Sequence, residues 1–240
     1  MAEPLTREQF RTAVADAVNG LLNVYREVDA MLRELGTILS EAEPRFVQLG
    51  KKLVPASGSK NFDARYLRNY HAAIFAPADT SEEEEEVEDE DEEEDENDEG
   101  DGEVEKKPKR PLTIATGSGI IVAQATIYDR ARQGFEPNLV VRALMRCRAD
   151  SQLVNGTRLK VSRYRFRKIL RAMNNHLGAP GKPLHTGVSV QVSGQPKTKY
   201  KLIFDVLSPV QSIPLFEITP EKLQEIASKA RQDWLAVPPL

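Results

Sequence analysis

The charged residues of this 240-residue chain are segregated, and this segregation limits how the chain can fold. Residues 80–105 hold nineteen Asp and Glu residues and no Lys or Arg. Such a segment has almost no apolar surface to bury and repels itself, so we expect it to stay extended and solvated. The formal charges of residues 1–79 sum to zero, and those of residues 106–240 sum to +15. The net charge of −4 therefore describes no single part of the molecule.

This pattern predicts three parts. Residues 1–79 form a helical module that dimerises, residues 80–110 form a disordered acidic linker, and residues 111–240 form a basic α+β domain that binds nucleic acid. The linker ends in the basic patch "KKPKRP", which is typical of nuclear import signals and also of simple phosphate contacts. The acidic run is either a solubilising linker, a competitor of nucleic acid for the basic domain, or a site for a basic partner protein.

The N-terminal module is expected to be a long helix. Thr6 and Gln9 have the spacing of a capping box. Apolar residues then recur in steps of four and three, which is the spacing of a coiled-coil seam. The predicted dimerisation residues are Val14, Val18, Leu21, Tyr25, Val28, Leu32, Leu35 and Leu39. A second apolar row widens this stripe. The alternative is therefore a helical bundle within one chain, without a partner. In that bundle, segments 46–54 and 61–75 fold back on the long helix as shorter helices.

The basic domain is expected to begin with two helices. Residues 118–133 fit a helix that ends at Gly134, although their β-branched residues make a strand the alternative. Residues 136–150 fit a helix of about twelve residues. The "TGSG" of residues 116–119 follows a short apolar run, as a phosphate-binding loop does. Val122 stands where a dinucleotide-binding pattern requires glycine, and no P-loop lysine follows.

A third, basic helix is expected over residues 162–177, between an N-cap at Ser162 and a stop at Gly178. Its apolar residues form one stripe, and its Arg and Lys residues spread over the remaining face. No Asp or Glu lies between Asp150 and Asp205, so this helix repels itself unless an external anion is near.

A β-hairpin with a basic tip is expected over residues 187–206, because apolar residues alternate on either side of "SGQPKTK". The order of helices and hairpin matches a winged helix-turn-helix, in which the third helix enters the major groove and the hairpin contacts phosphates. A different α+β module with a basic sheet is the alternative. The predicted nucleic-acid-binding residues are Arg163, Arg165, Arg167, Lys168, Arg171, Lys197, Lys199 and Lys201. A last helix starts at the N-cap Thr219 with Pro220 in its first turn.

The sequence gives little support for catalysis. The three histidines lack metal-ligand spacing, and the single cysteine, Cys147, excludes an intrachain disulfide and a cysteine-based zinc cluster. We therefore expect no enzyme, no cofactor and no metal. No run of about 20 apolar residues is present, so no membrane span is expected.

The sequence as a whole predicts a mainly α fold with a small β component. The predicted function is DNA binding by a transcriptional regulator or DNA-organising factor that is a homodimer. It prefers duplex DNA, with RNA as an open possibility. The alternatives are a chaperone or scaffold whose acidic run binds a basic protein, and a viral or structural assembly protein that binds nucleic acid without sequence preference. The expected location is the cytoplasm or nucleoid, or the nucleus if the source is eukaryotic or viral.

Overall fold

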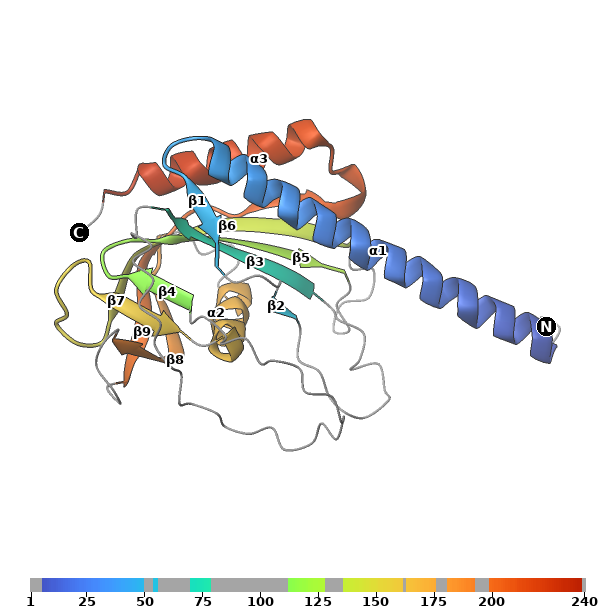
Figure 1. Ribbon diagram of the computed structural model, residues 1–240, viewed down its shortest axis with the longest axis horizontal. Coiled ribbons are helices and arrows are strands. Elements are labelled where there is room, and N and C mark those ends of the chain that lie inside the picture. The colour runs from blue at the N-terminus through green and yellow to red at the C-terminus, as the bar shows by residue number, and fades with distance from the viewer. Residues whose placement is uncertain are drawn as a thin grey trace, which may run out of the picture.

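A computed structural model describes residues 6–49, 54–55, 70–78, 112–127, 136–161, 163–175, 181–192 and 199–238. Within these ranges the fold is one curled antiparallel sheet with helices on both of its faces (Figure 1). Its strands follow the order β1-β3-β5-β6-β9-β8-β7-β4, with β2 paired to β3 and β10 paired to β6. The expectation of a mainly α fold is therefore wrong.

The bounds of the elements in chain order are α1 Arg7–Glu41, β1 Phe46–Gln48, β2 Val54–Pro55, β3 Tyr70–Pro77, β4 Leu112–Ala115, β5 Ile120–Thr126, β6 Asn138–Ala149, β7 Arg158–Val161, α2 Arg163–Asn175, β8 Leu184–Val192, β9 Lys199–Leu207, β10 Gln211–Pro214, the short 3₁₀ helix η1 Leu215–Glu217 and α3 Pro220–Leu235.

Two segments predicted as helices, 118–133 and 136–150, instead contain the central strands β5 and β6. The side chains from Leu139 to Met145 are all buried, because the sheet is covered on both faces at this point. A strand buried on both faces reads as a continuous apolar run, and such a run has no period of two that distinguishes it from a helix. The β-branched residues of both segments favour strands.

The winged helix-turn-helix is also wrong. The basic helix α2 is preceded by β7 and followed by β8, so the described residues before it form no helix-turn-helix. The segments expected to fold back as helices supply strands instead, with β1 and β2 pairing to β3 and β3 pairing to β5. Strands from before and after the acidic run therefore belong to one sheet.

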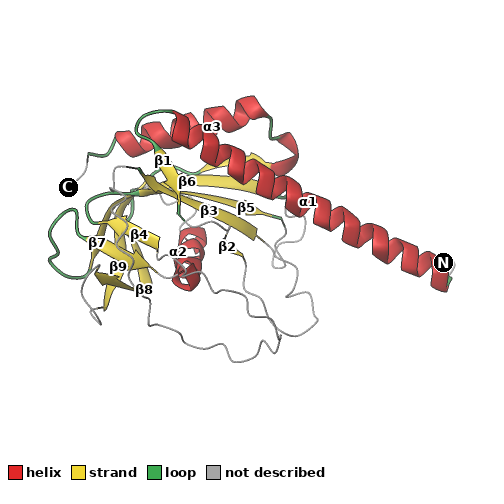
Figure 2. Cartoon of the chain, viewed as in Figure 1, coloured by secondary structure: helices red, strands yellow, loops and turns green. Residues whose placement is uncertain are grey.

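The helices divide the core into two clusters on opposite faces of the sheet (Figure 2). On one face α2 packs against β8, and its residues Phe166, Ile169, Leu170 and Met173 are fully buried. On the other face α3 contacts β5 and β6, and α1 contacts β1, β3 and α3. Alternate residues of each covered strand thus enter different cores.

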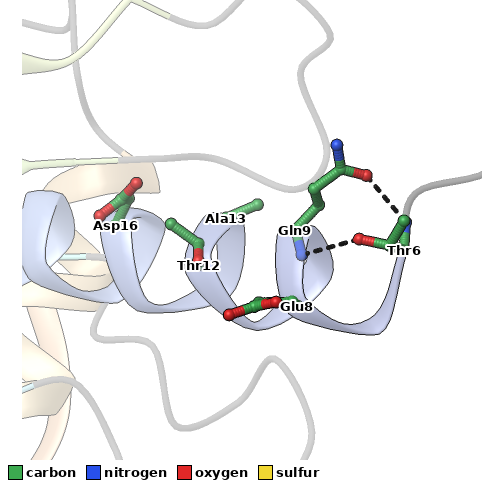
Figure 3. Close-up of a pocket in the computed structure, with 6 residues that line it drawn as sticks. All are labelled: Thr6, Glu8, Gln9, Thr12, Ala13 and Asp16. Atoms are coloured by element: carbon green, nitrogen blue, oxygen red, sulfur yellow. Dashed lines mark hydrogen bonds between the residues drawn. The ribbon is translucent and has the colours of Figure 1, made fainter.

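Helix α1 packs on the sheet only through its C-terminal half, and its N-terminal half projects away from the body of the molecule (Figure 1). The predicted capping box forms: the backbone N–H of Thr6 donates to Gln9 Oε1 over 2.9 Å, and that of Gln9 donates to Thr6 Oγ1 over 3.3 Å (Figure 3). Val28, Leu32, Leu35 and Leu39 are buried in the chain's own core. The expectation of a coiled coil along this whole seam is wrong, because half of it packs within the chain.

Candidate nucleic-acid interface

One face of strands β7, β8 and β9 is not covered by a described helix. Along β8 the side chains alternate, with Leu184, Thr186 and Val188 buried on the side of α2 and His185 and Gly187 exposed on the other. Neighbouring strands share this alternation, because residues paired in an antiparallel register lie on the same face. We call the exposed side the open sheet face. It belongs to the same side of the sheet as α1 and α3, which cover other strands.

Basic residues gather on the open sheet face. The register pairs Ser189 with Lys201 and Gln191 with Lys199 across β8 and β9, and it pairs Gln191 with Lys160 on β7. Lys199 and Lys201 are exposed, and Lys160 is half-buried. Lys199 and Lys201 therefore lie on β9 and Lys160 on β7, and the polar side chains of β8 lie between these two strands. Arg158, two residues before Lys160 on β7, lies on the same face.

The carboxylates at the border of this face are already engaged. Asp205 accepts two hydrogen bonds from Arg148 Nε, over 2.9 and 2.7 Å, and these bonds raise the pKa of the guanidinium. Asp150 Oδ1 accepts the backbone N–H of Lys201 over 3.1 Å. Among the described residues, no carboxylate lies within ion-pair distance of the ammonium groups of Lys160, Lys199 or Lys201. These three ammonium groups thus have no ion-pair partner in the described part of the chain.

The residues predicted to bind nucleic acid do not form one surface. Lys199 and Lys201 lie on the open sheet face, whereas α2 packs on the opposite side of the sheet. Lys168 and Arg171 are exposed on the outer side of α2. The backbone of Arg163, Arg165 and Arg167 is helical, but their side chains lie outside the description, and so does Lys197 altogether.

Sequence reasoning missed Lys160 and Arg158. The signal was present in "RLKV", where basic and apolar residues alternate with the period of a half-buried strand. The local pattern indicates only a possible short strand, and its pairing with β8 depends on long-range register that no local pattern specifies.

The "TGSG" loop before β5 is not built to hold a phosphate. The backbone N–H groups of Thr116, Gly117 and Ser118 donate to the carbonyl groups of Thr157, Cys147 and Ala115. A phosphate-binding loop needs such groups free to point at the anion. The loop lines a pocket of about 420 Å³ with Arg146, Asn155 and Trp234, and its hydrogen bonds fix it to the ends of β6 and β7.

Cys147 is fully buried within the sheet, and burial, followed by the nearby charge of Asp205, raises the pKa of its thiol. The thiol therefore stays protonated at neutral pH and is a poor nucleophile. Among the described residues, no group of three or more His, Cys, Asp or Glu side chains is placed to hold a metal ion. None of the described helices combines the length and apolarity that crossing a bilayer requires.

Comparison with known proteins finds no family model, no curated protein and no solved structure that matches this chain.

Proposed function

We propose that the protein binds duplex DNA through the open sheet face and that it contacts phosphates rather than base edges. The observation that supports the proposal is the set of Lys160 on β7 and Lys199 and Lys201 on β9, on either side of β8 and without a described carboxylate partner. No Phe, Tyr or Trp is found among the described residues of this face, since Tyr200 packs on the side of α2. Single-stranded nucleic acids are usually held by several stacking rings, so the composition of the face favours a duplex.

The charge of the face sets the expected salt dependence. Each phosphate neutralised by a lysine releases condensed counterions, so about three contacts give a slope near −3 in a plot of log affinity against log salt. This contact set carries no sequence information, because phosphates are common to every sequence. We therefore expect similar affinities for unrelated duplexes and a weaker affinity for single-stranded DNA.

A pair of charge-reversal variants tests the location. The variant Lys199→Glu/Lys201→Glu is expected to lower duplex affinity at least tenfold and to reduce the steepness of the salt slope by about two, measured by fluorescence anisotropy at several salt concentrations. The matched control is Lys168→Glu/Arg171→Glu, which changes the charge equally on exposed positions of α2. The control should bind like the unaltered protein. The reverse result would place binding on α2 and overturn the proposal, and a flat salt response of the unaltered protein would do so too.

The acidic run favours a second candidate function, in which the protein is a scaffold for a basic partner. Nineteen carboxylates in residues 80–105 supply the charge such a partner needs. Replacing residues 81–105 with a Gly-Ser segment of equal length separates the two functions. Duplex binding should persist or tighten if the sheet face binds DNA. Binding of a basic protein such as a histone should be lost if the run is a partner site.

A further inference from the structure

The apolar stripe of α1 continues beyond the part of the helix that packs on the sheet. Phe10, Val14, Val18 and Leu22 are between 45 and 60% exposed. The buried residues of α1 are Val28, Leu32, Leu35 and Leu39. At 100° per residue, Phe10 and Val14 lie within about 40° of the direction of Val28 around the helix axis, whereas Val18 and Leu22 lie about 80° and about 120° from it. The exposed stripe therefore overlaps the direction of the interface between α1 and the body of the molecule at Phe10 and Val14, and it turns partly around the helix at Val18 and Leu22. We call residues 7–22 the projecting segment.

The projecting segment lacks the packing that a helix of its length needs. Isolated helices of about 15 residues are marginal in water, because nucleation is costly and each residue adds little. Gly20 costs about 1 kcal/mol relative to Ala in a helix interior, and no atom lies within 4 Å of the Cβ that an alanine would add there. The helix of the projecting segment therefore needs an apolar surface to stabilise it, and the described part of this chain does not provide one.

The direction of the projecting segment is set where α1 leaves the sheet. His71 on β3 is 3% exposed, its Nδ1 lies 2.7 Å from Asp29 Oδ1, and its ring stacks on Tyr25 at a centroid distance of 5.1 Å. Both partners of His71 belong to α1 and lie just after the projecting segment. A polar contact and a ring contact with one strand therefore hold this part of the helix against the sheet.

The charges of residues 7–27 indicate what kind of surface can cover the stripe. This part of α1 has three basic residues, Arg7, Arg11 and Arg26, and three acidic ones, Glu8, Asp16 and Glu27. An amphipathic helix that lies on a membrane has a strongly basic polar face, and a nucleic-acid contact needs net positive charge. A neutral, mixed-charge helix with an apolar stripe instead packs well against another helix with the same properties. The projecting segment of a second copy of this chain is such a helix.

The packing of the C-terminal half of α1 selects one orientation of the second copy. The sheet and α3 lie on the same side of α1 as the stripe, directly after the projecting segment. A parallel partner helix lying on the stripe would run on into the space that the sheet and α3 occupy. An antiparallel partner would place its own body beyond the free N-terminal end, where Figure 1 shows no described element.

We propose that two copies associate through a short antiparallel contact between their projecting segments. The contact spans about 24 Å, the length of sixteen helical residues. Such a contact lies at the small end of specific interfaces, below about 1,200 Å² of buried surface. We therefore expect a dimer that dissociates in the micromolar range. This inference is independent of the proposed DNA binding, which uses another face.

Sedimentation equilibrium over a range of protein concentrations tests the dimer. The weight-average mass of the full chain should rise from the 26.8 kDa of a monomer towards twice that value. The variant Val14→Glu/Val18→Glu should remain a monomer throughout, because it places charges on the stripe. The matched control Thr12→Glu/Asn19→Glu adds the same charge on the opposite side of the helix and should dimerise like the unaltered protein. A monomeric unaltered chain at millimolar concentration, or dimerisation of the stripe variant, would overturn the proposal.

Spin labels test the orientation. Single cysteines replace Glu8 or Ala15 in a Cys147→Ala background. In an antiparallel pair centred near residue 15, the two labels at position 8 are offset by about 21 Å along the helix axis and those at position 15 by almost none, so the distance between labels should be clearly longer at position 8. Equal distances at the two positions would indicate a parallel pair and overturn the antiparallel arrangement. The near-UV circular dichroism of each variant checks that its folded body is intact.

Discussion

At the scale of single residues, Gly119 shows how closely the chain packs where the "TGSG" loop enters β5. A Cβ at this position would lie 2.6 Å from the carbonyl oxygen of Leu144 and 2.8 Å from Trp234 Nε1. The first of these atoms belongs to the backbone of a central strand, so it cannot move without disturbing the sheet. Glycine is therefore required here by close approach, and not by its backbone angles.

Gly119→Ala is expected to lower the free energy of unfolding by about 1–3 kcal/mol, because the added methyl group overpacks the contact between β6 and α3. Urea denaturation followed by far-UV circular dichroism measures this loss. Gly187→Ala on β8 is the control, since nothing lies within 4 Å of its added Cβ. It should keep or raise stability, by up to about 1 kcal/mol. A neutral Gly119→Ala would show that the sheet adjusts freely at this position.

At the scale of elements, local signals identified the helices and one hairpin. The capping box predicted the start of α1, Thr219 and Pro220 predicted the start of α3, and the apolar stripe of residues 166–177 predicted α2. Alternation predicted the hairpin of β8 and β9. Each of these signals depends on residues close in sequence, and the apolar stripes have a period that only one structure satisfies.

The central strands were missed because their burial depends on partners far away in the sequence. The side chains from Leu139 to Met145 are buried on both sides only because α3 and the α2-side core cover both faces of β6. The same limit applies to the candidate site. Lys199 and Lys201 were identified as basic residues of a hairpin, but the face that they share with Lys160 follows from the pairing of β7 with β8. Neither fact can be read from a local window.

Gly20→Ala tests the energetics of α1 as an element. The substitution replaces a poor helix former where the added Cβ meets no atom within 4 Å, so stability should rise by up to about 1 kcal/mol and the helical signal at 222 nm should increase. Gly36→Ala is the comparison, because its Cβ would lie 3.1 Å from Phe75 Cε1, and it should gain less. A larger gain at position 36 would contradict this account. Thermal unfolding followed at 222 nm measures both variants.

At the scale of the whole molecule, residues 79–111 connect two distant positions in the sheet. β3 lies next to one edge strand and β4 is the other edge strand, with β5, β6, β9, β8 and β7 between them. Removing residues 81–105 would leave eight residues for this connection, which reach about 30 Å at full extension. A shortened connection thus risks pulling β4 from β7. This is why the replacement of the acidic run should preserve its length.

The same topology has a consequence for how the protein can be taken apart. The piece before the acidic run ends in β3, which pairs with β5 over six residues, and its helix α1 also packs on α3. Two separately encoded polypeptides, 1–80 and 106–240, should therefore complement each other without a peptide bond between them. Co-expression with an affinity tag on one polypeptide should recover both in equal amounts, and failure to recover the untagged one would show that covalent continuity is essential. If complementation succeeds, the gap between the polypeptides becomes a place where a reporter can be inserted and assembly followed as a bimolecular reaction.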